Sequence, residues 1–144
     1  MKTIKLKQPY YILLSTILFV CSTGCILISK YDETAYLQAT SLKDYALTIM
    51  DKATEPYEMH KAEIAKFQED INKAYEYSKS RAKNKKSTLQ WEILKDPDKN
   101  LIGGFISRWK AEGTLGKPFI DNAKNGLISP AFDEIIDLES KKNK

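Results

Sequence analysis

The chain has 144 residues, with 23 lysines and arginines against 19 aspartates and glutamates, and a formal net charge of +4. Three of the 23 basic residues and no acidic residue lie among the first 24 positions, so the remainder carries 20 basic against 19 acidic groups. A nearly neutral chain lacks the general attraction to phosphate on which nucleic-acid binding depends, and about 120 residues suffice for one domain. We therefore expect a single domain and no nucleic-acid partner.

The first 25 residues have the pattern of a bacterial export signal. Three lysines precede an uncharged apolar run, which ends in the small residues Ser-Thr-Gly and Cys25. A cysteine at this place is typical of a lipoprotein signal, in which its sulfur receives diacylglycerol and the preceding peptide is removed. The pattern predicts a signal peptide over residues 1–24 and a lipidated anchor and linker over residues 25–31.

A second interpretation of the same segment is an uncleaved membrane helix over residues 9–28. These 20 residues carry no charge, and their length is about what a hydrocarbon core of ~30 Å requires. Two features favour this alternative: Ser22 stands where lipoprotein signals usually carry an aliphatic residue, and residues 26–28 are apolar. Both interpretations place residues 30–144 outside the cytoplasm, because the lysines hold the amino end inside.

The first two predicted helices form an antiparallel hairpin. The first runs from about Asp32 to Ala53, and its small and apolar residues recur at spacings of three and four along one stripe. The second begins after the sequence Thr-Glu-Pro at 54–56. Its stripe consists of Tyr57, His60, Ile64, Phe67, Ile71, Ala74 and Ser78. A short break between helices with matching stripes indicates that they pack against each other.

Residues 79–86, KSRAKNKK, carry five positive charges and no negative one. We expect them to end the second helix, where cations stabilise the helix dipole, and to form a solvated loop. The alternative is a contact with anionic lipid head groups or with an acidic partner.

A third, shorter helix is expected from about Thr88 to Lys95. Ser87 and Gln90 have the spacing of a capping box, in which the two side chains satisfy free backbone amides. Leu89 is expected to be buried. Asp96-Pro97 ends the helix, because the residue before proline is pushed out of helical geometry.

Two further helical regions follow. Asn100 is expected to cap a fourth helix, and Gly113 to end it in a left-handed conformation. The last region begins near Pro118, directs Leu127 inward, and is split or kinked near Pro130. No strand-like alternation follows the export signal, so the sequence predicts an all-α fold.

The predicted domain is a helical hairpin packed with three or four shorter helices into a small bundle. It covers residues 32–139. The tail over residues 140–144 is too polar to pack.

No residue pattern identifies a catalytic or metal site. His60 is the only histidine of the chain and lies on an apolar stripe, where a structural role is expected. Once Cys25 is lipidated, no cysteine is available as a ligand. Carboxylate pairs lie near helix starts or on solvated faces, and no serine lies in a strand-turn-helix elbow. We predict that the protein is not an enzyme and uses no cofactor and no metal.

The candidate binding surface lies around the third and fourth helices. Two adjacent glycines early in a helix cost roughly 2 kcal/mol relative to alanine, so a compensating interaction is expected. It is either close packing under a large ring such as that of Trp91, or a backbone surface open to a peptide or ligand. Aromatic residues and arginine are common both in binding interfaces and in small cores. The candidate residues are Trp91, Gly103, Gly104, Phe105, Arg108 and Trp109.

Several segments resemble small bacterial lipoproteins of an uncharacterised family. These segments are 28–32 with Tyr36, Thr40, Leu42 and Lys43, then 50–53, 103–105 with Arg108 and Trp109, and 132–136. The resemblance covers most of residues 28–139 and implies acylation at Cys25, but it supplies no activity and no catalytic residue. In lipoproteins of bacteria with two membranes, a residue other than Asp after the cysteine usually directs the protein to the outer membrane. Ile26 therefore favours the outer membrane if the organism has one.

The sequence thus predicts a lipid-anchored, non-enzymatic binding or structural module on the periplasmic face of a bacterial membrane. Its expected partners are the membrane, through Cys25, and another envelope protein. Three alternatives stay open: a small hydrolase or ligand carrier with a pocket near Tyr57 and His60, a single-span membrane protein, and a lipoprotein of a mobile element that blocks a surface receptor. Its oligomeric state is not fixed by the sequence.

Overall fold

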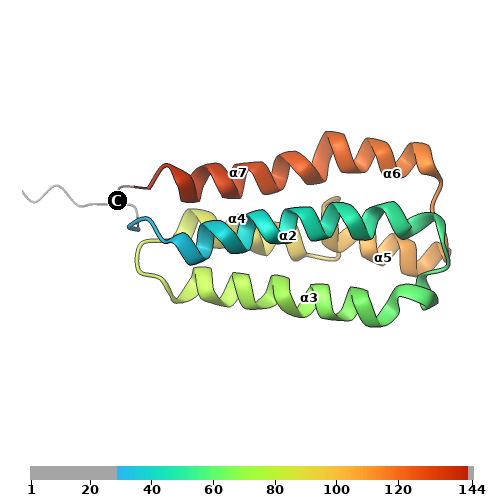
Figure 1. Ribbon diagram of the computed structural model, residues 1–144, viewed down its shortest axis with the longest axis horizontal. Coiled ribbons are helices and arrows are strands. Elements are labelled where there is room, and N and C mark those ends of the chain that lie inside the picture. The colour runs from blue at the N-terminus through green and yellow to red at the C-terminus, as the bar shows by residue number, and fades with distance from the viewer. Residues whose placement is uncertain (1–28, 143–144) are drawn as a thin grey trace, which may run out of the picture.

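The protein is represented by a computed structural model that describes residues 29–142, which form an all-α bundle (Figure 1). Its helices are α2 (Glu33–Asp51), α3 (Tyr57–Ser80), α4 (Lys85–Lys95), α5 (Ile102–Glu112), α6 (Lys117–Ala123) and α7 (Ser129–Ser140). A 3-10 turn, η1 (Lys52–Thr54), follows α2, and a π-helical segment, η2 (Lys124–Ile128), joins α6 to α7. The predicted fold class is confirmed. The predicted export signal, Cys25 and the candidate membrane helix lie outside the described residues.

The bundle has four columns, which run in alternating directions (Figure 1). Helices α2 and α3 are the predicted hairpin, α4 and α5 together form the third column, and α6, η2 and α7 form the fourth. Neighbouring columns contact each other through α2 with α3, α3 with α4, α4 with α7, and α7 with α2. Both ends of the described chain therefore lie at one end of the bundle. We call the end with Ser29 and Lys142 the proximal end, and the end with η1 and Gly113 the distal end.

The long hairpin follows its predicted stripes. Asp32 caps α2, because its Oδ1 accepts the amide of Ala35 at 2.9 Å. The inward face of α2 combines three small residues, Ala35, Ala39 and Ala46, which let the neighbouring helices approach closely, with the larger Leu42, Ile49 and Met50. On α3 the predicted stripe is buried except at His60, which is half-buried. One apolar core joins these faces to those of the other helices.

The predicted start of the third helix is wrong. Helix α4 begins at Lys85, and Ser87 is buried, where its hydroxyl accepts a hydrogen bond from Lys142 at 3.2 Å. The serine is therefore used inside the bundle and caps no helix. Leu89, predicted to be buried, is 50% exposed as a consequence of this register. The end at Asp96-Pro97 is confirmed, since α4 stops at Lys95.

The free-energy cost of placing Gly103 and Gly104 in a helix is offset by close packing against neighbouring backbone atoms. A Cβ atom at Gly103 would overlap the carbonyl oxygens of Lys95 and Asp96, and one at Gly104 would overlap that of Lys99. The turn between α4 and α5 therefore folds directly over the start of α5. Close packing was one of the two expectations, but the partner is this turn and not an aromatic ring. The prediction that Asn100 caps this helix is wrong. Asn100 is exposed, and the residue directly before α5 is Leu101, which makes no side-chain cap.

The last column continues through the predicted kink. The amide of Ser129 donates to the carbonyl of Lys124, five residues earlier, which widens the helix by one residue. Pro130 follows and has no amide to donate, so a regular hydrogen bond is not available at that position. The extra residue rotates the helix face, so that Ile128 is buried and Leu127 is 49% exposed. The prediction that Leu127 points inward is therefore wrong.

Alanine substitutions test the packing of the glycines. We expect Gly103→Ala and Gly104→Ala each to lower the free energy of unfolding by roughly 2–3 kcal/mol, because the added methyl group displaces the turn backbone. Gly126→Ala is the matched control, since nothing lies within 4 Å of a Cβ there. That substitution should be neutral or stabilise by up to about 1 kcal/mol. Equilibrium denaturation measures all three, and equal effects would contradict the packing account.

Candidate functional site

The aromatic residues of the predicted binding surface belong mainly to the core. Trp91 is 3% exposed and meets Phe132 of α7 edge to face, with ring centroids 6.1 Å apart. Trp109 is fully buried, and its indole nitrogen donates to the carbonyl of Glu55 at 2.9 Å. Together with the buried Gly103, these residues hold helices together. The structure therefore does not place the six candidate residues on one surface.

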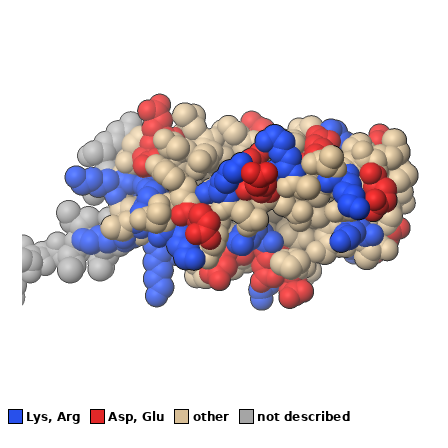
Figure 2. Space-filling view, turned by 90° about the horizontal axis from the view of Figure 1, so that it is seen from below, with Lys and Arg blue, Asp and Glu red and all other residues tan. Residues whose placement is uncertain are grey.

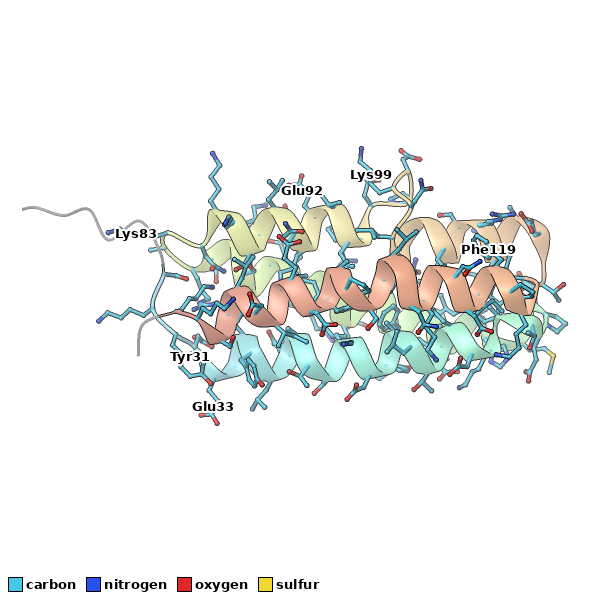
Figure 3. All side chains as sticks on the ribbon, turned by 90° about the horizontal axis from the view of Figure 1, so that it is seen from above. Tyr31, Glu33, Lys83, Glu92, Lys99 and Phe119 are labelled. Atoms are coloured by element: carbon cyan, nitrogen blue, oxygen red, sulfur yellow. The ribbon has the colours of Figure 1, made fainter. Side chains whose placement is uncertain are left out.

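The other three candidates border a surface cavity near the distal end. Gly104, Phe105 and Arg108 line a cavity of about 250 Å³ with Phe119 and Leu127 of the last column. The rings of Phe105 and Phe119 stack with centroids 6.0 Å apart, and the Arg108 guanidinium lies 4.1 Å from the centroid of Phe119. Phe119 lies toward the end of the bundle opposite Lys83 (Figure 3). The exposed Leu127 makes this an apolar opening, and the cation at its edge, Arg108, is paired with Glu112 at 2.7 Å.

His60 fits its predicted structural role. Its Nε2 lies 2.7 Å from a carboxylate oxygen of Glu55, and its ring lies 5.7 Å from that of Trp109. Tyr57 packs edge to face against the same indole, with ring centroids also 5.7 Å apart. Both side chains of the alternative hydrolase pocket therefore pack against the buried Trp109. No group of three or more metal-ligating side chains occurs within residues 29–142.

A buried polar network closes the proximal end. The Asn84 amide donates to the carbonyl of Ser78 at 3.0 Å and to its hydroxyl at 2.8 Å. Its oxygen accepts from the hydroxyl of Ser29 at 2.9 Å and from the ammonium group of Lys142. The Ser29 amide also donates to the carbonyl of Lys83 at 3.1 Å. Residue 29 is thus fixed on the bundle, whereas the sequence placed it in a linker.

Glu139 is the charged centre of this network. Its side chain is 1% exposed and pairs with Arg81 at 2.8 Å and with Lys142 at 2.5 Å. Arg81 also donates to the carbonyl of Lys30 at 2.6 Å, so α3, α7 and the start of the chain meet here. The side chain of Lys142 is only 5% exposed. The prediction that residues 140–144 are too polar to pack is therefore wrong for Lys142, because Glu139, Asn84 and Ser87 satisfy its ammonium group.

The pKa values of the buried pair follow from these contacts. Burial by itself raises the pKa of Glu139, but hydrogen bonds from Lys142, Arg81 and Ser87 outweigh it and hold that pKa below its ordinary value. Burial lowers the pKa of Lys142, and the neighbouring Glu139 carboxylate opposes this only in part. Asp32 has a lowered pKa as well: its partial burial is outweighed by hydrogen bonds from the Ala35 amide and the Tyr77 hydroxyl.

Four exposed lysines surround this network. We call Lys30, Lys83, Lys85 and Lys86 the basic rim, and none of them pairs with a carboxylate of the described residues. Lys and Arg side chains gather at the left end of the molecule in Figure 2, which is the proximal end. Many lysines along the sides of the bundle are paired, for example Lys66 with Asp70 at 3.1 Å. The rim is therefore a local excess of positive charge on a nearly neutral protein.

The loop that carries the rim is held in an unfavourable conformation. Lys83 has a φ of 62°, a left-handed value that costs a residue with a Cβ roughly 1–2 kcal/mol. Lys85 and Lys86 occupy the first turn of α4, where cations oppose the helix dipole by about 0.3–1 kcal/mol each. Asn84 and Ser29 fix this loop from inside. The lysines are thus presented at a cost in stability, which is common at functional sites.

A cavity of about 530 Å³ opens beside the rim. It is lined by the rim residues Lys83, Lys85 and Lys86 together with Asn84, Ser87, Leu89, Leu138, Lys141 and Lys142. Leu89 is half-exposed and Leu138 is partly buried, so apolar surface lies beneath the ammonium groups. A cavity of this kind suits an anionic group attached to an apolar body.

Comparisons with known proteins add no assignment. No protein-family model matches the chain, and neither curated proteins nor solved structures gave a match. The resemblance to small bacterial lipoproteins thus stays a prediction. Within residues 29–142, no helix has the length and apolar character needed to cross a membrane.

Sequence reasoning missed Asn84, Glu139 and Lys142. The contacts that join them to distant segments link residues 55 to 58 positions apart, and no local spacing records such pairs. One signal was present: Glu139 follows Phe132 and Ile135 at helical spacings of seven and four, which places a carboxylate on a buried stripe.

Substitutions at the buried carboxylate test the network. We expect Glu139→Gln to lower the free energy of unfolding by about 3 kcal/mol at neutral pH, because Arg81 and Lys142 lose their counter-charge in a buried site. Lys142→Met should cost less, since Glu139 keeps Arg81. Lys141→Met is the control: its side chain is 73% exposed and should change stability by less than about 0.5 kcal/mol.

The pH dependence gives the same network a second readout. Because the pKa of Glu139 is lowered in the folded protein, its contribution is complete above the ordinary carboxyl pKa of 4.5 and is lost as the pH falls through the lowered value. Denaturation at several pH values should therefore show a shallower loss of stability on acidification for Glu139→Gln than for the unaltered protein. Identical slopes would contradict the assignment of an ionised, stabilising carboxylate.

Proposed function

We propose that this protein is a lipid-anchored, non-enzymatic module of the bacterial envelope, attached through Cys25. One observation supports it above all: Ser29, four residues after Cys25, is fixed at the same end of the bundle as the basic rim. Acylated cysteine and unpaired lysines are the two signals that together hold a protein stably on a membrane.

The length of the tether strengthens this proposal. Four residues span at most about 14 Å when fully extended. That distance is comparable with the Debye length of about 8 Å at physiological salt, over which an anionic surface attracts cations. A lipid on Cys25 would therefore keep the proximal end beside the bilayer, and the distal end would face away from it. On this proposal the protein acts on the periplasmic face, and the outer membrane is favoured if the organism has one.

The distal cavity is the proposed contact for an envelope protein. It holds the half-buried Phe119 and the guanidinium of Arg108, and aromatic residues and arginine are enriched in protein interfaces. The exposed Leu127 adds apolar surface beside them. It also lies toward the end of the bundle that an anchored protein would present to the surroundings. A binding role needs no catalytic group at this position.

The anchor is tested by replacing Cys25 with Ser. We expect the unaltered protein to fractionate with membranes and to have the mass of a chain that begins at Cys25 and carries acyl groups. Cys25→Ser should lose the acyl mass, because serine has no thiol to receive diacylglycerol. Intact mass spectrometry of the membrane and soluble fractions measures both.

Cys21→Ser is the matched control, because it removes the neighbouring thiol and leaves the proposed acylation site. It should keep the acyl mass and the membrane association. An unaltered protein that retains Met1 and lacks acyl mass while staying in the membrane would replace this proposal by the single-span alternative.

The protein contact is tested by crosslinking in membranes followed by capture. Leu127→Asp should reduce the recovery of any captured partner at least about tenfold, since a charge is placed in the apolar opening. Leu37→Asp is the control, because Leu37 is exposed to a similar degree, 53% against 49%, on α2. Failure to recover a partner at native abundance, or equal recovery with both variants, would overturn this part of the proposal.

A further inference from the structure

The lysines of the basic rim have no carboxylate partner among the described residues. Many lysines on the sides of the bundle are engaged locally, as Lys117 is with Asp121 at 3.1 Å and Lys124 with Asp51 at 2.6 Å, whereas Lys99 and Lys110 stand singly within residues 29–142. Glu33 is an exposed carboxylate at the same end, but Figure 3 shows its side chain projecting away from Lys83.

The rim is also held in place and does not depend on flexible chain. Lys83 is positioned by its carbonyl, which accepts the Ser29 amide at 3.1 Å, and by the neighbouring Asn84, which is 4% exposed. Lys85 and Lys86 follow on the first turn of α4. The backbone of three lysines is thus held in place around one cavity, which Lys141 also lines.

The surface between these charges is apolar. Leu89 is 50% exposed beside them, and Leu138 lies deeper in the same cavity. Leu89 also borders a second cavity of about 360 Å³, whose lining includes Lys79, Lys83 and Lys85 and one carboxylate residue, Glu92. Lysine side chains combine an apolar stem with a charged head, and a leucine among them matches the boundary between head groups and acyl chains.

We propose that the basic rim is a docking surface for anionic phospholipid, with lipid phosphates bound by Lys83, Lys85 and Lys86 and with Leu89 at the head-group boundary. The inference rests on the proposed function, because the lipid on Cys25 is what holds this end beside a bilayer. Docking would fix the orientation of the bundle, so that its long axis points away from the membrane and the distal cavity is presented outward.

The experiment measures the protection of lysines on vesicles. The full chain, purified from membranes, is reconstituted into vesicles of phosphatidylcholine alone or of phosphatidylcholine with phosphatidylglycerol, and its amines are labelled with a water-soluble reagent. Labelling of Lys83, Lys85 and Lys86, read by peptide mass spectrometry, should be about fivefold slower on the anionic vesicles, and high salt should abolish the difference. Lys99 and Lys110, which also lack a carboxylate partner among the described residues, are internal controls and should label equally on both.

Two variants of equal charge make the test specific. Lys85→Gln/Lys86→Gln should abolish the protection of Lys83, whereas Lys99→Gln/Lys110→Gln should leave it unchanged. Equal labelling of the rim on both kinds of vesicle would overturn the inference, and so would equal protection by soluble glycerol phosphate with phosphatidylcholine vesicles alone. Intact mass of the same sample reports acylation at Cys25 separately, so that loss of rim protection in an acylated protein contradicts the docking surface and leaves the anchor standing.

Discussion

The proximal end of the bundle depends on one buried carboxylate. Glu139 holds Arg81 from the end of α3 and Lys142 from the last described turn, and Arg81 in turn holds the carbonyl of Lys30. A buried ion pair contributes little net stability compared with apolar residues of the same size, but its directional contacts define a geometry. Here that geometry places Ser29, the loop of Lys83 and the tail against each other. Everything proposed for the proximal end follows from this arrangement.

The two ends of the bundle are built by different means. At the proximal end, polar side chains connect segments through hydrogen bonds. Toward the distal end, backbone meets backbone: Tyr57 donates its amide to the carbonyl of Gly113 at 2.8 Å, and Leu115 donates to that of Ala53 at 2.7 Å. Trp109 fills the interior beneath these contacts. The proximal end therefore offers charge, and the distal cavity offers apolar and aromatic surface.

The fold was largely predictable, because the spacing of small and apolar residues along α2 and α3 identifies the buried face of each helix. The errors came from interactions that no local pattern contains. Ser87 was assigned to a cap but bonds to Lys142, 55 residues later, and Leu127 is turned outward by the single extra residue of η2. The predicted surface around Trp91 and Trp109 failed for another reason: aromatic residues serve cores and interfaces alike. The lysine-rich segment was noticed in the sequence, but its fixation by Ser29 and Asn84 required the structure.

Both ends of the described residues meet at one end of the bundle, and this has a practical consequence. Lys142 is buried and shares its partner Asn84 with Ser29, so a reporter or affinity tag joined after Lys144 is separated from this contact by only two residues. In an acylated protein such a fusion would lie between the proximal end and the bilayer, where its volume would separate the domain from the membrane surface. A reporter attached to the exposed side chain at position 114, in the turn after α5, avoids that crowding and leaves the backbone bonds of Gly113 and Leu115 intact.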